Sequence, residues 1–160
     1  MRIAASVDVP EAGGPERHSL LQEARLVVEI MVARRAATRA DESSLDEIRC
    51  ALKQMHATSG DAFVGAYVRF HLAVARAAGP VLEALLRHLQ PEIERAIADD
   101  LPPEHVVREW RSQHTKIARS IERSDPTGCV RAMLIHLDPH HAHPTVTDLA
   151  LGPYEQVTGA

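Results

Sequence analysis

The sequence has few aromatic residues, two cysteines, no excess of positive charge and no long apolar run. Aromatics make up only 3% of its 160 residues, so the core must consist of Leu, Val, Ile and Ala, which favours helices over a β-sandwich. The net charge is −4 and the arginines are scattered among acidic residues, so we expect no direct binding of nucleic acid by this chain. No apolar run reaches the roughly 18 residues of a membrane helix, so no membrane partner is expected.

The two cysteines and the N-terminus indicate a cytoplasmic protein. Cys50 and Cys129 lack a C-x-x-C spacing and fall in helical patterns, which predicts buried, reduced thiols. The first residues do not form a charged segment followed by an apolar one, so no secretory signal is expected. The motifs G-x-S-x-G, H-E-x-x-H and the P-loop are absent, which disfavours the familiar hydrolase and kinase classes.

Apolar residues recur every three or four positions along most of the chain, and no period-two pattern persists. We therefore predict an all-α antiparallel bundle of about six helices. Residues 1–15 are expected to be a flexible lead, 16–138 a helical ligand-binding domain and 139–160 an irregular tail. The expected helices cover residues 16–40, 44–57, 61–78, 80–99, 102–123 and 126–137.

Local signals refine these helices. The segment Ser44–Glu47 has the pattern of a capping box, which predicts a helix start at Ser44. Pro91 is expected to bend or break the fourth helix, and Asp125 with Pro126 to start the last one. The predicted core-facing stripe of the first helix consists of Leu20, Ala24, Val27, Val28, Met31, Val32 and Ala36.

Three histidines lie inside apolar helical stretches and are the main functional signal. His71 shares a helix face with Phe63, Tyr67, Phe70, Val74 and Ala78, and His114 and His136 belong to the two last helices. Burying an imidazole without a partner is unfavourable. Two readings are open: three separate hydrogen-bonded histidines, or one shared metal ion, and we favour the shared site.

Four segments together resemble the FCD domain, the effector-binding part of GntR-type bacterial transcription regulators, over about residues 19–138. They are Phe70–Gly79, with its Phe-His pair and alanine-rich continuation, Gln113–Ala118, Ala132–Leu137 and Glu23–Glu29. The resemblance implies that His71, His114 and His136 bind a divalent metal (Zn, Ni or Mn). It also implies an organic-acid effector that Arg25 could pair through its carboxylate, and a homodimer. Trp110, one turn before His114, is interpreted chiefly as a packing residue and kept as a candidate ligand contact.

The chain departs from the family pattern at two positions. The aspartate expected four residues before the histidine is Tyr67, and the asparagine after Gly79 is Pro80. A phenol binds divalent zinc poorly unless it is deprotonated, so three readings stay open. They are a three-histidine metal site with an open position, a hydrogen bond from the Tyr67 hydroxyl to the ligand, and loss of the metal with a cavity that binds an apolar molecule.

Only about 18 residues precede the region that resembles the FCD domain, too few for a winged helix-turn-helix. The leading hypothesis is therefore a stand-alone domain that binds a small molecule, expected to be a carboxylate, at a histidine metal site. The alternative is a metal-dependent enzyme of lyase, isomerase or cyclase type that uses the three histidines and Tyr67 as general acid or base. A third reading is a dimerisation module.

Overall fold

The computed structural model describes residues 15–138, which form six helices and no strand. The prediction of an all-α bundle is therefore confirmed for this part of the chain. The expected irregular tail, and all but the last residue of the expected lead, lie outside the described residues. The helices are α1 (Pro15–Arg39), α2 (Glu42–Ala57), α3 (Asp61–Ala78), α4 (Pro80–Asp99), α5 (Glu104–Glu122) and α6 (Pro126–Leu137).

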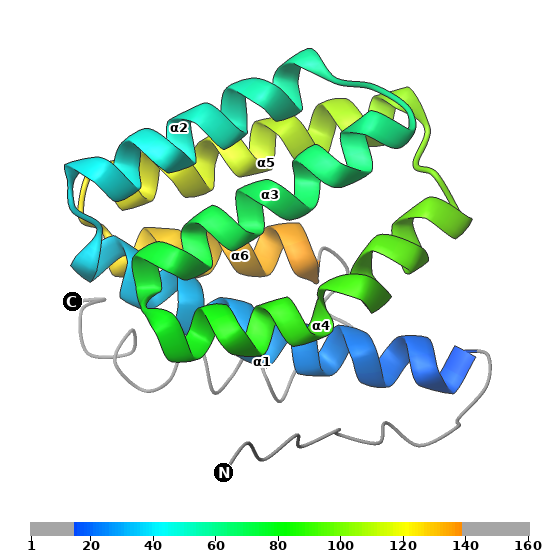
Figure 1. Ribbon diagram of the computed structural model, residues 1–160, viewed down its shortest axis with the longest axis horizontal. Helices are drawn as coiled ribbons and strands as arrows, with labels where there is room; N and C mark the ends of the chain where they lie inside the picture. Colours follow the sequence, from blue (N-terminus) through cyan, green and yellow to red (C-terminus); the bar gives the residue numbers. More distant parts are fainter. Residues whose placement is uncertain (1–14, 139–160) are drawn as a thin grey trace, which may run out of the picture.

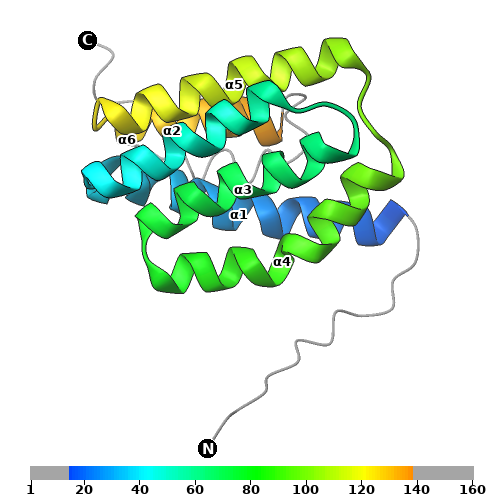
Figure 2. The same cartoon turned by 45° about the horizontal axis from the view of Figure 1, so that its top comes forward.

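Helix α3 runs through the middle of the bundle, and the other helices surround it (Figures 1 and 2). It packs against α1, α2 and α4, while α5 packs against α2 and α6, and α6 packs against α1. Thirteen of the 18 residues of α3 are buried, including the whole predicted face from Phe63 to Ala78. A side chain on α3 can therefore meet groups from α1, α5 and α6 in the centre of the molecule.

The predicted start of α2 is wrong by two residues. The helix begins at Glu42, and its cap is Asp41, whose carboxylate accepts from the backbone N–H of Ser44 at 2.8 Å. Ser44 is thus the residue that is capped and not the capping residue, because an aspartate three residues earlier offers the stronger acceptor. The start of α6 follows the prediction: Asp125 accepts from the N–H of Gly128, and Pro126 occupies the first turn.

Pro91 bends α4 without ending it. The helix is continuous from Pro80 to Asp99 and changes direction along its length, as both views of the bundle show (Figures 1 and 2). A proline inside a helix removes one backbone hydrogen bond and crowds the preceding turn, which is enough to produce such a bend.

The predicted core stripe of α1 is wrong in its N-terminal half. Val32 and Ala36 are buried, but Leu20, Val27 and Met31 are 45–50% exposed. The side chains that face the core there are Arg25, Leu26, Glu29 and Ile30. Hydrophobic periodicity assigns charged residues to solvent by default, so it could not detect that a charged pair occupies the inner face of this helix.

The predicted burial of the cysteines is correct for one of the two. Cys129 is buried in α6, whereas Cys50 is exposed on α2, so the expectation of two buried thiols is wrong for Cys50. Within residues 15–138, no helix combines the length and the apolar character needed to cross a bilayer.

Candidate metal centre

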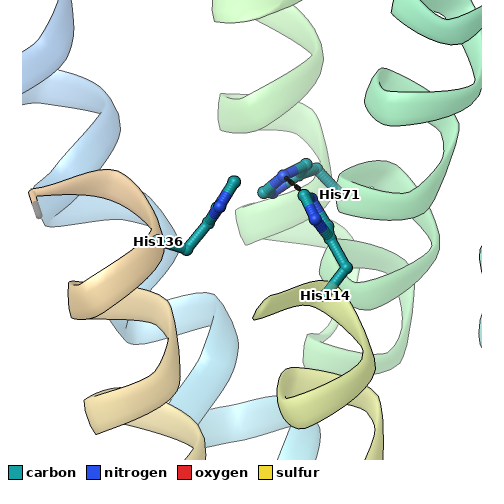
Figure 3. A group of neighbouring side chains, drawn as sticks. All are labelled: His71, His114 and His136. Atoms are coloured by element: carbon teal, nitrogen blue, oxygen red, sulfur yellow. Dashed lines mark hydrogen bonds between the residues drawn. The ribbon is translucent and has the colours of Figure 1, made fainter. Parts of the chain in front are cut away.

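His71 from α3, His114 from α5 and His136 from α6 converge in the centre of the bundle (Figure 3). All three side chains are buried, and one ring nitrogen from each lies within 4.8 Å of the others. The sequence prediction that these histidines meet is therefore confirmed, although they lie up to 65 positions apart. The three helices meet there because α5 and α6 are neighbours, and α3 packs against α2, a neighbour of α5, and against α1, a neighbour of α6.

In two of the three rings, the Nδ1 atom is hydrogen-bonded to a group that can only accept a hydrogen bond. Nδ1 of His71 donates to a carboxylate oxygen of Glu29, which comes from α1. Nδ1 of His114 donates to the backbone carbonyl of Trp110 at 2.6 Å, one turn earlier in α5. Neither a carboxylate nor a carbonyl can donate, so both Nδ1 atoms carry the ring proton.

The third ring is held in the same way by a side-chain amide. Nδ1 of His136 lies 2.9 Å from Oε1 of Gln113. The amide nitrogen of Gln113 donates to the carboxylate of Glu109 at 3.1 Å, and this contact fixes the oxygen of the amide toward His136. All three imidazoles are thereby held as the tautomer whose Nε2 carries no proton.

These tautomers leave Nε2 of His71 and Nε2 of His114 facing each other at 3.0 Å. With both ring protons on the Nδ1 side, the two atoms present lone pairs to each other and need a proton or a cation between them. Metal-bound histidines in proteins show the same arrangement, with one ring nitrogen on the ion and the other donating to an acceptor. The donor set therefore fits a divalent cation.

Burial keeps the histidines neutral. It lowers the pKa of His71, although Glu29 opposes the shift, and it lowers the pKa of both His114 and His136 well below the ordinary value. The neighbouring imidazoles and the Arg25 guanidinium add to the lowering at His114 and His136. Neutral imidazole is the form that binds a metal ion.

Glu29 and Gln113 are site residues that the sequence analysis missed. Glu29 has no exposed surface and bridges Arg25 and His71, with Nε of Arg25 donating to it at 2.6 Å. Burial by itself favours the neutral acid, but His71 and Arg25 outweigh it and lower the pKa of Glu29 to about 2. The signal in the sequence was the four-residue spacing of Arg25 and Glu29, which permits an ion pair on one helix face.

Tyr67 and Trp110 complete the wall around the histidines. The Tyr67 hydroxyl accepts from Arg25 and donates to Nε2 of His136, at 2.8 Å in the second case. Burial raises the pKa of Tyr67 to about 12 against the opposing charge of Arg25, so the phenol keeps its proton. Trp110 is partly buried, and its ring centroid lies 5.2 Å from that of Tyr67 and 5.9 Å from that of His136.

Comparison with known proteins agrees with the resemblance to the FCD domain noted in the sequence. The sequence profile of the FCD domain family matches residues 21–139, which is most of the chain. A curated relative, the HTH-type transcriptional regulator LutR of Bacillus subtilis (strain 168), is 28% identical over 147 residues. The match covers 85% of this chain and 63% of the relative, so the chain spans less than two thirds of that protein's length.

Proposed function

We propose that this chain, which belongs to the FCD domain family, is a sensory domain that takes up a divalent cation through His71, His114 and His136. The observation that carries the proposal is the convergence of three buried imidazoles, with one ring nitrogen of each within 4.8 Å of the others and every Nδ1 already donating to Glu29, Trp110 or Gln113. When bound, the ion would supply positive charge and a coordination position in a dry environment, and it would tie three helices together.

The donor set favours zinc or nickel over manganese. Three neutral imidazoles suit Zn²⁺ and Ni²⁺, whereas Mn²⁺ prefers carboxylate and carbonyl oxygens. The buried carboxylate nearest the histidines is that of Glu29, and both its oxygens are engaged by Arg25 and His71. Its role is therefore to orient His71 and raise the basicity of that ring, as carboxylates behind metal-bound histidines do.

Because LutR is a transcriptional regulator, we extend this proposal to a role in transcriptional regulation, with the protein in the cytoplasm. In this view the domain responds to its ligand, and the response is passed on by a DNA-binding segment or partner. The enzyme alternative stays a prediction, because the described residues form no substrate site beside the hydroxyl of Tyr67. The organic carboxylate expected as a ligand would have to compete with Glu29 for Arg25, whose charge the glutamate already pairs.

Metal uptake by the purified protein tests the proposal. Metal-free protein mixed with Zn²⁺ or Ni²⁺ and passed through a desalting column should retain close to one equivalent of metal by elemental analysis. The variant His114→Ala should retain less than a tenth of that amount, because two imidazoles hold the ion much more weakly than three. His105→Ala, at an exposed position of the same helix, is the matched control and should bind like wild type. Equal retention by all three proteins would contradict the site.

We also propose that the domain forms a homodimer through α1 and α4. Five of the seven large apolar side chains that are exposed among the described residues lie on these helices, namely Leu20, Val27, Met31, Val81 and Leu85. Val81 and Leu85 line a groove of about 660 Å³ whose other lining residues also belong to these two helices. The ion pair of Glu83 and Arg87 beside it carries both signs of charge, which suits a second copy related by a two-fold axis better than an anionic partner.

The oligomeric state is expected to depend on this face. Wild type at tens of micromolar should scatter light as a dimer, and Leu85→Glu should scatter as a monomer, because the charge would be buried against apolar groups. Leu101→Glu, an exposed leucine outside the α1–α4 face, is the control and should remain dimeric. A wild-type monomer, or a dimer that Leu85→Glu leaves intact, would contradict this interface.

A further inference from the structure

The aromatic ring of Tyr67 occupies the space beside all three histidines. Its centroid lies 4.6 Å from that of His71, 5.1 Å from that of His114 and 5.6 Å from that of His136. Among the ring pairs of residues 15–138, Tyr67 alone contacts the whole trio. The side chain is only 2% exposed, so the ring is part of the packed interior.

The ring is fixed at both ends. Its hydroxyl accepts from Arg25 and donates to Nε2 of His136, and Arg25 is held in turn by Glu29. On the opposite side the ring packs against Phe63 and Trp110. Moving the ring away from the histidines would break the buried hydrogen bond with Arg25 and the packing against Phe63 and Trp110, so displacing the ring has a free-energy cost.

The void that adjoins His71 and Tyr67 is small. A void of about 10 Å³ is lined by Arg25, Glu29, Tyr67 and His71 on one side and by Leu86 and Gln90 of α4 on the other. Such a volume holds about one water molecule. Sites for organic ligands have volumes of roughly 300–1,000 Å³. The large groove between α1 and α4 shares no lining residue with this void, so it does not extend the space at the histidines.

We propose that Tyr67 excludes organic ligands from the three-histidine centre and limits a bound metal to partners no larger than water or chloride. The inference rests on the proposed metal site and narrows its ligand class. The cation itself is then the ligand that this domain detects, and Tyr67 is the specificity-determining residue.

Protein loaded with Co²⁺ provides a spectroscopic test, since the visible absorption of Co²⁺ changes when a ligand enters its coordination sphere. Wild type should show no saturable change with acetate or malonate up to tens of millimolar. Tyr67→Ala and Tyr67→Asp should bind at least one of these anions at least tenfold more tightly than wild type. Tyr67→Phe keeps the ring without the hydroxyl and should exclude both anions as wild type does, which separates filling of space from hydrogen bonding.

Each outcome bears on one proposal. Saturable acetate or malonate binding by wild type as tight as in the truncated variants overturns the exclusion, and this result does not depend on whether those variants fold. Folded, Co²⁺-loaded Tyr67→Ala and Tyr67→Asp that both ignore the anions also overturn it. Failure of wild type to take up Co²⁺ contradicts the metal site instead. In that case the fluorescence of Trp110, the single tryptophan, which lies against Tyr67, reports anion entry into metal-free protein.

Discussion

Replacing Glu29 with glutamine is expected to lower the free energy of unfolding by roughly 3–5 kcal/mol, one of the largest effects that a single substitution in this chain should have. Glu29 is fully buried, and its carboxylate is the partner of the guanidinium of Arg25, which is also buried. Glutamine keeps the shape of the side chain but removes the negative charge. The cation of Arg25 is then left in the interior without a counter-charge, and His71 loses its strongest acceptor.

Denaturant unfolding followed by circular dichroism in the presence of chelator measures this effect without a contribution from metal. Glu83→Gln breaks a comparable four-residue ion pair with Arg87 on the surface of α4 and should change stability by less than about 1 kcal/mol. The double variant Arg25→Met with Glu29→Leu should recover most of the loss, because it removes both charges together. If Glu29→Gln unfolds within about 1 kcal/mol of wild type, the charge of Arg25 has another partner and the proposed role of Glu29 is wrong.

The fold and the three histidines could be predicted because both leave a regular trace in the sequence. Imidazoles at apolar helical positions stand out against the period of the surrounding residues, as His71 does among Phe70, Leu72 and Val74. The short turn before Pro126 makes α5 and α6 antiparallel neighbours, so His114 and His136 can meet. The helical pattern also marked His71 on α3, the family resemblance favoured a common site, and the structure brings the three histidines together.

The groups that orient the histidines could not be predicted in the same way. Glu29 and Gln113 are polar residues of helices whose outer faces are also polar, and periodicity does not distinguish a polar residue that faces inward from one in solvent. Their burial depends on partners from other helices, namely His71 for Glu29 and His136 for Gln113. The same limit explains the error along α1, where the apolar stripe around Val27 lies outside the core.

Removing the metal is the second change expected to have a large effect. At a free metal concentration about 1,000 times the dissociation constant, binding adds about 4 kcal/mol to the stability of the folded state, so chelator should lower the unfolding midpoint by roughly 10 °C. His114→Ala lacks one of the three ligands and should melt at the same temperature with and without chelator. His105→Ala, on the exposed side of α5, should respond as wild type does.

Acid, like chelator, should lower the stability of the folded protein, and this direction follows from the lowered pKa values of the histidines. Well above pH 6.5 the imidazoles are neutral in both the folded and the unfolded chain, so their protonation does not affect stability. Below pH 6.5 the unfolded chain takes up protons that buried His71, His114 and His136 refuse, so unfolding becomes easier and metal is released as the pH falls. Metal-loaded wild type should therefore lose thermal stability between about pH 7 and 5 more steeply than His114→Ala, which has lost both the ion and one of these groups.

The depressed pKa of Glu29 adds a second loss of stability between pH 4.5 and 2 that both proteins share, so the comparison above pH 5 isolates the histidines. Parallel stability profiles for wild type and His114→Ala, together with equal responses to chelator, would show that the three imidazoles are separate core residues without a common ion.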